Sequence, residues 1–388
     1  MTQTTATRVL LSGDEGTGTL AAVRGLHAGG YEVWLAVSRS DTYAARSRRL
    51  AGVLEVTDPG SDVERHAEEL ARAAARLGAH AVLPSTEGSL RAVTGREHLF
   101  PSATAIGTSL PEVLARATDK RLLNVLAGEA GLQAPPSFDL SDPDLDLEAL
   151  PFPAIVKPLR SVDDAGRGLR VGEAERVSSP AELRRVLAPA TDRDWLLQAY
   201  IEGTLAAVCG VAWRGELVCA VHQCSPRIWP PDCGISSYAY TTPANPEREA
   251  GVAALVRSIG WSGIFGVQFL LAGSHAYAID FNPRVYGSLA LAIAAGPNLP
   301  AIWADLLLGR AVTAEPYRAG FGYRVEEDDY RALLAAFRRG ERAQALRGLW
   351  PRRRTVHGIF ALTDPMPTVT SVQKLGRTLV SSRREARP

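Results

Sequence analysis

A short segment near residue 280 carries side chains suited to holding a metal ion and stabilising a phosphoryl group. It reads Asp280-Phe281-Asn282-Pro283-Arg284 and follows an apolar run. Alternate side chains of an extended strand share a face, so we expect Asp280, Asn282 and Arg284 to point the same way. A carboxylate beside an amide oxygen suits Mg²⁺, and a neighbouring guanidinium can stabilise the charge of a transferring phosphoryl group. The alternative interpretation is an ordinary strand end followed by a proline turn.

Several further segments with polar or glycine residues come earlier in the chain, in a defined order. They are Asp119-Lys120 at the start of an expected helix, Lys157 at the end of the expected strand Ala154–Pro158, the loop from Ser161 to Gly168, the stretch Gln198–Gly203, and Gly266-Val267-Gln268-Phe269. A lone lysine is usually a solvated surface charge. The order of these parts therefore carries more information than any one of them.

Length and charge exclude some classes of protein. With 388 residues the chain is too long for one small core, and we expect two or three domains. The 43 Lys and Arg residues nearly balance the 42 Asp and Glu residues, so no global field favours nucleic acid or a membrane surface. The run Val9–Leu11 is too short for a signal peptide, and Gly and Pro interrupt the apolar region Leu289–Gly309. We therefore expect a soluble, cytoplasmic protein.

Residues 7 to 110 alternate short apolar strands with helical patterns. We expect strands at Arg8–Ser12, Glu32–Val37 and Ala81–Pro84, and helices at Gly18–Ala28 and Val63–Leu77. This alternation predicts a parallel, doubly wound sheet. The turn after the first strand contains Gly13, Gly16 and Gly18, and its helix N-terminus could hold an anion. The glycine order G-x-x-G-x-G, and the lack of an acidic residue ending the second strand, argue against bound NAD.

The remainder of the chain predicts helices, strands and hairpins. We expect a helix from Thr118, as its N-cap, to Gly131. Further helices are expected at Pro180–Leu187, Pro246–Ile259 and Pro300–Leu308, strands at Leu169–Val171 and Trp195–Ile201, and hairpins around Arg214-Gly215 and over Gly263–Phe281. A helical and basic segment follows Phe321.

The four cysteines fall close together, at positions 209, 219, 224 and 233. Their spacings lack the close Cys-x-x-Cys pairs of a zinc ribbon, and Cys209 and Cys219 lie in expected apolar strands. The pattern favours buried thiols over a structural zinc site.

The ordered series of two lysines, a glycine loop, a linker strand and a metal strand resembles the ATP-grasp superfamily over residues 115 to 310. Residues 7 to 110 resemble the Rossmann-like domain that precedes this fold in many members. Asp364-Pro365-Met366-Pro367 resembles the tails of bacterial carboxylate-amine ligases of the family. The resemblance implies a multidomain α/β and α+β chain. The expected parts are a Rossmann-like pre-ATP-grasp domain at 1–112, a small ATP-grasp lobe at 113–193, a large lobe at 194–315 and a C-terminal extension at 316–388.

The resemblance also assigns roles to individual residues. Lys120 and Lys157 would contact ATP phosphates, and the loop from Ser161 to Gly168, with Gly166, Arg167 and Gly168, would close over them. The chain around Gln198, Tyr200, Ile201 and Glu202 would meet the nucleotide. Asp280, Asn282 and Gln268 would hold Mg²⁺, while Arg284 would stabilise the transferred phosphoryl group and the acyl phosphate.

Three positions depart from the family pattern. The family usually has a carboxylate where Gln268 stands, so one expected metal ligand is neutral. Leu205 occupies the place of the ribose-binding Glu, which Glu202 could replace only if the strand shifts. Asp163 and Asp164 place negative charge in a loop meant to cover phosphates. These departures bear on activity more than on fold.

The resemblance implies an ATP-dependent carboxylate-amine ligase that forms an amide bond through an acyl phosphate. Its substrates would be a small-molecule carboxylate and an amine, such as amino acids or peptides, and a homodimer is left open. Arg227 could hold a substrate carboxylate, and Trp229, Tyr238 and Tyr240 could wall a pocket. The alternative for Tyr238 and Tyr240 is packing within a sheet. Glu87, at the end of a strand, could bind an amine or cap a helix. The rival interpretations are a nucleotide-binding protein with weak or no catalysis and a sensing or partner role, and an oxidoreductase using the turn at Gly13.

Overall fold

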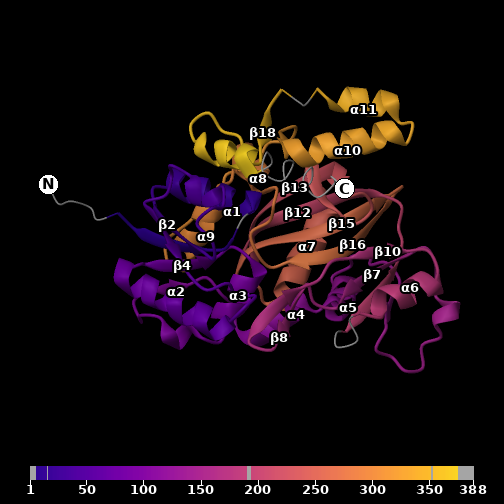
Figure 1. Cartoon of the computed structure of the whole chain (residues 1–388), viewed down its shortest axis with the longest axis horizontal. Helices are drawn as coiled ribbons and strands as arrows, with labels where there is room; N and C mark the ends of the chain where they lie inside the picture. Colours follow the sequence, from indigo (N-terminus) through magenta and orange to yellow (C-terminus); the bar gives the residue numbers. More distant parts are fainter. Residues whose placement is uncertain (1–5, 15, 190–193, 351–352, 375–388) are drawn as a thin grey trace, which may run out of the picture.

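The structure, a computed structural model, describes residues 6–14, 16–189, 194–350 and 353–374. Among these residues the strands form four sheets. Figure 1 shows an N-terminal unit on one side of a large central sheet, a small sheet on the other side, and helices α10 (Glu326–Arg338) and α11 (Arg342–Gly348) above them.

The N-terminal unit is built on a sheet with the strand order β3-β2-β1-β4-β5. Its strands are β1 (Arg8–Ser12), β2 (Glu32–Val37), β3 (Gly52–Glu55), β4 (Ala81–Pro84) and β5 (Ala105–Ile106); its helices are α1 (Thr17–Ala28), α2 (Val63–Leu77) and α3 (Glu87–Val93), with 3₁₀ turns at Ala44–Arg46 and Glu97–Leu99. The neighbouring strands are parallel, as the alternation of strands and helices predicts.

Both faces of this parallel sheet are buried, but by different parts of the chain. Val9 and Leu11 belong to a hydrophobic cluster with α1, whereas Leu10 between them packs with α2, because successive side chains of a strand point to opposite faces. The first cluster also contains side chains of α8 (Leu289–Ala295) and α9 (Leu299–Leu307). The core of the N-terminal unit is therefore completed by residues from far along the chain.

The small sheet is antiparallel and has the strand order β10-β7-β11-β6. Its elements are β6 (Ser137–Asp139), β7 (Ala154–Pro158), β10 (Glu175–Val177) and β11 (Trp195–Ala199), with α4 (Pro111–Thr118), α5 (Lys120–Glu129), α6 (Pro180–Leu187) and a 3₁₀ turn at Leu147–Ala149. Between β7 and β10 the chain forms a separate hairpin of β8 (Val162–Ala165) and β9 (Gly168–Val171).

The central sheet has the strand order β16-β15-β12-β13-β14-β17-β18. Its strands are β12 (Thr204–Trp213), β13 (Glu216–Trp229), β14 (Ile235–Thr241), β15 (Gly263–Ala272), β16 (His275–Asn282), β17 (Gly322–Arg324) and β18 (Thr355–His357). One face packs on α7 (Pro246–Ile259) through residues such as Val208 and Phe265. The other face packs on the N-terminal unit through Ala207 and Cys209. The predicted metal ligands Gln268, Asp280 and Asn282 lie on the rows of this second face.

The C-terminal segment crosses back to the N-terminal unit. The carboxylate of Asp364 is buried, and its Oδ2 atom accepts hydrogen bonds from Arg24 Nε at 3.0 Å and Ser47 Oγ at 2.7 Å. Its Oδ1 atom accepts one from the backbone N–H of Arg48 at 2.9 Å.

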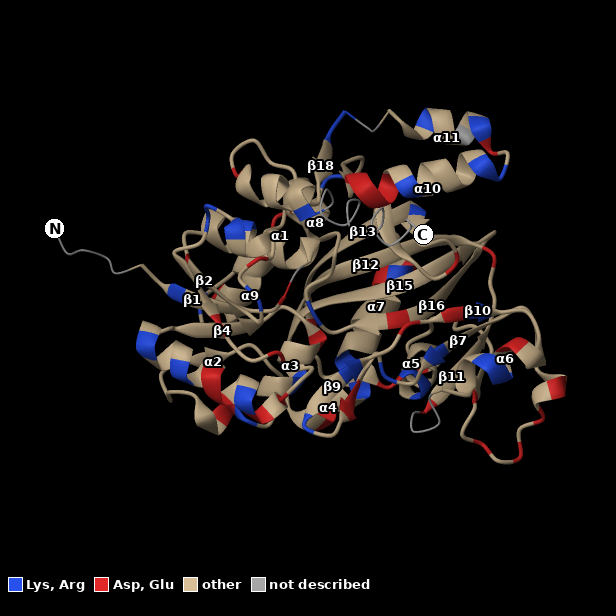
Figure 2. Ribbon diagram, in the orientation of Figure 1, with Lys and Arg blue, Asp and Glu red and all other residues tan. Residues whose placement is uncertain are grey.

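Figure 2 shows basic and acidic residues interspersed over the helices, with an acidic first turn on α10.

Cys209 and Cys224 are buried and Cys219 and Cys233 half-buried, and none of these four described residues forms a disulfide. No single helix in the described part of the chain is long and apolar enough to cross a membrane. The pair α8 and α9 meets the length and composition test only together, with a bend of 91° between them.

Candidate functional site

The predicted metal strand is β16, and its polar residues meet a partner from β15. Asp280 lies directly opposite Gln268, and Asn282 lies opposite Gly266. These rows continue to Ala207 and Cys209 on β12, so Asp280, Gln268 and Asn282 share the face that packs toward the N-terminal unit. The structure thus brings together the three oxygen donors that the sequence singled out.

This donor set is poor in charge. No group of three or more His, Cys, Asp and Glu side chains that could hold a metal ion occurs among the described residues. Asp280 supplies a carboxylate, and Asn282 and Gln268 can add amide oxygens. Hard oxygen ligands of this kind fit Mg²⁺, which commonly takes one or two carboxylates and fills the rest of its shell with phosphate and water. The residues present fit a weakly held Mg²⁺ ion.

Arg284 lies just beyond the end of β16 and points back toward it. Its Nη2 atom donates to Asn282 Oδ1 at 3.1 Å, and its Nη1 atom donates to the carbonyl oxygen of Val285 at 3.1 Å. These bonds hold the guanidinium beside the metal strand. One third of the side chain remains exposed, so a ligand can reach it.

Lys157, at the end of β7, reaches the same strand from the small sheet. Its Nζ atom donates to Gln198 Oε1 at 3.0 Å and to the carbonyl oxygen of Ile279 at 2.9 Å. The side chain is buried, and this burial lowers the pKa of Lys157 from 10.5 to about 8. The negative charge of Asp280 opposes that shift, whereas the positive charge of Lys120 adds to it. An anionic ligand would restore the favourable charge balance.

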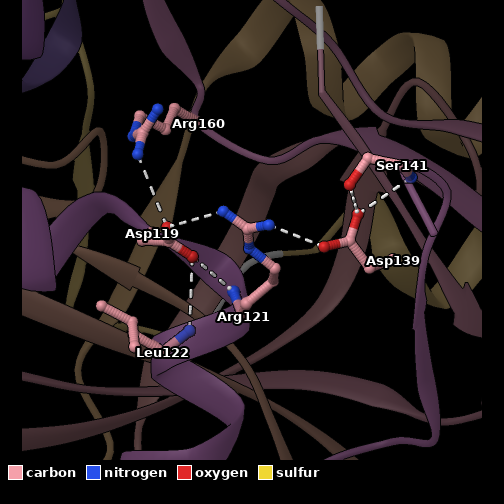
Figure 3. Close-up of polar contacts among 6 residues, drawn as sticks. All are labelled: Asp119, Arg121, Leu122, Asp139, Ser141 and Arg160. Atoms are coloured by element: carbon pink, nitrogen blue, oxygen red, sulfur yellow. Dashed lines mark hydrogen bonds and ion pairs between the residues drawn. The ribbon is translucent and has the colours of Figure 1, made fainter.

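Lys120 is positioned by a helix cap that the sequence placed one residue too early. The predicted helix is confirmed as α5, which begins at Lys120, whereas Thr118 is the last residue of α4 and not the N-cap. The cap is Asp119, whose carboxylate accepts from the backbone N–H groups of Arg121 and Leu122 at 2.9 and 3.3 Å. Figure 3 shows this cap, with ion pairs from Asp119 to Arg121 and Arg160 at 3.5 Å each.

Lys120 itself is hydrogen-bonded to the start of the glycine loop and to the residue two positions before it. The backbone N–H of Lys120 donates to the carbonyl oxygen of Leu159 at 3.2 Å, and its Nζ atom donates to Ser161 Oγ at 2.9 Å. Lys120 is buried and contributes to the electrostatics at Lys157. The two predicted phosphate-binding lysines therefore lie in one charged environment with Asp280.

The predicted glycine loop is the β8–β9 hairpin, which contacts the N-terminal unit. Gly166 turns the hairpin with a φ of 65°, a conformation that favours glycine. The carbonyl oxygen of Arg167 accepts from the backbone N–H of Val63 at 2.8 Å. A Cβ atom on Gly168 would lie 2.0 Å from the carbonyl oxygen of Gly60, so only glycine fits there. A role of these residues in covering phosphates stays a prediction.

The expected nucleotide-contacting stretch begins at Gln198 within β11 and continues beyond the end of this strand. The side chain of Gln198 is engaged on both sides, since it accepts from Lys157 and donates to Ser137 Oγ at 3.1 Å. The backbone N–H of Tyr200 donates to the carbonyl oxygen of Pro153 at 3.2 Å, and Arg176 stacks on its ring. Ile201 is half-buried and Glu202 exposed. Their contact with a nucleotide also stays a prediction.

Arg227 has an internal partner in place of a substrate. Its Nε and Nη2 atoms donate to the two carboxylate oxygens of Asp329 at 2.5 and 3.0 Å, and its guanidinium lies 4.1 Å from the centre of the Tyr238 ring. Arg324 contacts the same carboxylate at 2.6 Å. A cavity of about 400 Å³ adjoins Arg227, Tyr238 and Trp350. Because its charge is already paired, Arg227 as a carboxylate clamp stays a prediction that its contacts do not favour.

Glu87 from the N-terminal unit lies beside Arg284, with 4.0 Å between Glu87 Oε2 and Arg284 Nε. It is buried, and Thr86, not Glu87, caps α3 by accepting from the N–H of Ser89. Burial raises the pKa of Glu87, and the charges of Arg284 and Lys120 oppose the rise. The sequence suggested amine binding or helix capping for Glu87, but not its approach to Arg284, which depends on packing across 197 positions.

Two of the first-turn glycines, Gly13 and Gly18, serve close packing, whereas a Cβ atom on Gly16 would find room. A Cβ atom on Gly18 would lie 2.5 Å from the carbonyl oxygen of Tyr286, and Thr17 Oγ1 donates to the carbonyl oxygen of Gly287 at 2.9 Å. The start of α1 therefore contacts the segment that follows Arg284. This close contact gives Gly18 a structural purpose and disfavours the NAD interpretation.

Comparison with known proteins finds similarity to ATP-grasp proteins. A family model described as "ATP-grasp in the biosynthetic pathway with Ter operon" matches residues 191–329. The large chain of carbamoyl phosphate synthase from Pseudomonas syringae pv. tomato is 24% identical over 221 residues, which cover 53% of this chain and 20% of that protein. The chain thus spans about a fifth of the length of this curated relative.

Solved structures resemble the chain over most of its length. An L-amino acid ligase from Bacillus licheniformis superposes with a TM-score of 0.59 at 16% identity, covering 81% of this chain and 78% of the ligase. The biotin carboxylase domain of Hydrogenobacter thermophilus 2-oxoglutarate carboxylase, in complex with MgADP and bicarbonate, gives a TM-score of 0.60 at 16% identity and covers 81% and 73%. At such identities the likeness establishes a shared fold.

Proposed function

We propose that this chain, which belongs to the ATP-grasp superfamily, is an ATP-dependent ligase that joins a carboxylate to an amine. A carboxylate is a poor electrophile until it gains a good leaving group. Its oxygen would attack the γ-phosphorus of ATP, and the bond to the bridging oxygen would break as ADP leaves. A neutral amine would then attack the carbonyl carbon of the acyl phosphate, phosphate would depart with the bonding electrons, and the amine nitrogen would lose a proton to give the amide.

The contribution of the protein to this reaction is positioning and charge stabilisation. Lys120 and Lys157 would face the phosphates, and Arg284 would stabilise the charge on the transferred group. Asp280, Asn282 and Gln268 would hold Mg²⁺, which when bound offsets the charge of the β- and γ-phosphates. The β8–β9 hairpin would cover the phosphates, and the stretch from Gln198 to Glu202 would meet the rest of the nucleotide.

The proposal includes the assignment of parts. Residues 1–112 would form the Rossmann-like pre-ATP-grasp domain, a proposal supported by the parallel strand order β3-β2-β1-β4-β5. Residues 113–193 and 194–315 would form the two ATP-grasp lobes, with an extension from 316 to 388. The substrates would be small molecules, with amino acids or peptides the expected class.

One observation carries the proposal: Lys157 of the small sheet donates to the carbonyl oxygen next to Asp280 on the central sheet. This bond supports a site in which a buried cation and the proposed metal-binding carboxylate would lie together between the two proposed lobes. A direct test is the melting temperature with millimolar MgATP, since ligand at about 100 times its dissociation constant adds roughly 2.7 kcal/mol to the free energy of unfolding. Phosphate release with pairs of amino acids tests the reaction itself. An unshifted melting temperature contradicts the proposal.

A second candidate function is a protein that binds the nucleotide but catalyses ligation weakly or not at all. Gln268 lies directly opposite Asp280, where the family usually places a carboxylate. A site with one carboxylate suits a sensing or partner role that needs binding alone. MgATP binding without phosphate release, across all amino acid pairs, favours this candidate.

A further inference from the structure

Glu87 presents a buried carboxylate oxygen that lacks a partner. Its side chain is 7% exposed, and its Oε1 atom has no hydrogen bond within the part of the chain that the structure describes. Its Oε2 atom is 4.0 Å from Arg284 Nε, which is too long for a hydrogen bond. Burying a carboxylate oxygen without a partner is costly, and a native protein seldom does so without a functional reason.

The nearby cations are engaged elsewhere. Arg284 gives its Nη atoms to Asn282 and Val285. Lys120 donates to Ser161, and Arg91 pairs with Asp164 at 3.8 Å. A role in capping α3 is also taken, by Thr86. Among the described residues no donor reaches Glu87 Oε1, and a ligand can supply one.

We infer that Glu87 binds the ammonium group of the carboxylate substrate, so that this substrate is an amino acid. The inference rests on the proposed function. Arg284, beside Glu87, would face the carboxylate that is activated, and Glu87 would face the ammonium group on the adjacent carbon. A guanidinium and a carboxylate side by side, within one site, match the two opposite charges of an amino acid zwitterion.

The chemistry assigns Glu87 to this substrate and not to the attacking amine. A carboxylate favours the protonated form of an amine that it binds. An ammonium group has no lone pair and cannot attack an acyl phosphate. Glu87 would therefore protect the amino group of the activated amino acid, while the second substrate must present a neutral amine. One consequence is that the amino group of the activated amino acid does not react with an acyl phosphate.

The test uses Glu87→Gln in the full chain, which keeps the shape of the side chain and removes its charge. Activation is measured with ATP and hydroxylamine, which traps the acyl phosphate as a hydroxamate. The probes are the common L-amino acids and the matching acids without an amino group, such as alanine against propionate. We expect the KM for the amino acid to rise by about 10²-fold in the variant, because one partner of a desolvated charge pair is lost. The KM for MgATP should change less than about twofold.

Glu68→Gln is the matched control, because it makes the same change on an exposed side chain of α2 in the same unit. It should behave as the wild type. If Glu87→Gln weakens amino acids and their deaminated analogues equally, or leaves the preference for amino acids intact, the inference is wrong. A parallel loss of MgATP affinity also overturns it, because Glu87 would then act by positioning Arg284.

Binding measurements separate this inference from the proposed function. The melting temperature of the wild type and of Glu87→Gln is followed with a mixture of L-amino acids, with no turnover required. A shift that depends on Glu87, in a protein that forms no hydroxamate, supports the inference and contradicts the ligase proposal. Hydroxamate formed equally well by Glu87→Gln contradicts the inference and supports the ligase. A wild type that neither binds amino acids nor forms hydroxamate contradicts both.

Discussion

The Nζ atom of Lys157 lies 2.9 Å from the carbonyl oxygen of Ile279, the residue before Asp280. This hydrogen bond joins the small sheet to the central sheet across 122 positions of the chain. It fixes a buried lysine beside the carboxylate expected to hold the metal. A phosphate that reaches Asp280 through a metal ion would meet Lys157 as well.

The affinity for ATP should fall as the pH rises through 8. Lys157 has a pKa of about 8 in the folded chain, so it carries its charge below that pH and loses it above. Phosphate binds the charged form, so affinity should drop about fivefold between pH 8 and pH 9. Titration calorimetry at the two pH values checks this. Lys157→Arg, which stays charged, is the control, and an equal drop in that variant contradicts the prediction.

Lys157 should make the ligand-free protein more stable as the pH rises, whereas ATP affinity falls over the same range. The unfolded lysine titrates near 10.5 and the folded one near 8, so the unfolded chain binds more protons between these values. The free energy of unfolding should therefore rise by up to about 3 kcal/mol from pH 8 to 10.5. Urea unfolding at both pH values measures it, and Lys157→Met should lack this contribution. The prediction fails if both proteins show the same pH dependence.

Asp280→Asn should remove the metal dependence of nucleotide binding. Asp280 is the carboxylate of the proposed donor set, and Gln268 opposite is neutral. Mg²⁺ should then no longer strengthen ATP binding, while the melting temperature stays close to that of the wild type, because the swap opens no cavity. Asp144→Asn, in an exposed loop, is the control. Unchanged Mg²⁺ dependence would place the metal elsewhere.

Gln268→Glu should strengthen the metal site. It puts a second carboxylate directly opposite Asp280, and affinity for a hard cation rises with the charge of its ligands. We expect the Mg²⁺ concentration needed for ATP binding to fall by about tenfold. Without metal the variant should be less stable, since like charges opposite each other on neighbouring strands repel. A variant that binds Mg²⁺ no better contradicts the assignment of Gln268.

Arg284→Ala should slow turnover more than it weakens nucleotide binding. Loss of one preorganised donor typically costs about 10²- to 10³-fold in kcat. Lys120, Lys157 and the metal would still hold the phosphates, so the Kd for ATP should change little. Phosphate release and calorimetry on the same preparation give both values. A stable variant with wild-type turnover would remove Arg284 from the catalytic residues.

Asp329→Asn should destabilise the fold. Asp329 is fully buried and is the counter-ion of both Arg227 and Arg324. Removing its charge leaves two arginines uncompensated, which typically costs about 3 to 5 kcal/mol. Urea unfolding measures the loss. Glu341→Gln, at an exposed ion pair with Arg339, should have little effect. An Asp329→Asn protein as stable as the wild type would show that the two arginines find other partners.

Local pattern was enough to predict the parts of the site that depend on neighbouring residues. The side-chain period of a strand placed Asp280 and Asn282 on one face, and the end of an apolar run placed Lys157 correctly. The cap of α5 was missed by one residue, because Thr118 and Asp119 are both good N-caps and only the hydrogen bonds distinguish them.

Packing between distant segments decided what the sequence could not. Arg227 is paired with Asp329, 102 positions away, and no local pattern indicates that partner. Glu87 lies near Arg284 because α8 and α9 pack into the core of the N-terminal unit. This packing brings the segment before α8, which contains Arg284, next to the unit that contains Glu87. The expected boundary at residue 112 divides the chain by sequence. The hydrophobic cluster of β1 and α1 extends across this boundary, because it also contains residues of α8 and α9.

The buried carboxylate of Asp364 has a consequence for the order of events during synthesis. Its partner Ser47 is made 317 residues earlier, and Arg24 is made 340 residues earlier. A ribosome adds roughly 5 to 20 residues each second, so the first sheet emerges tens of seconds before the side chain that closes it. During that interval the emerging N-terminal unit also lacks α8 and α9. The nascent chain therefore has to carry an incomplete core until Asp364 has been made.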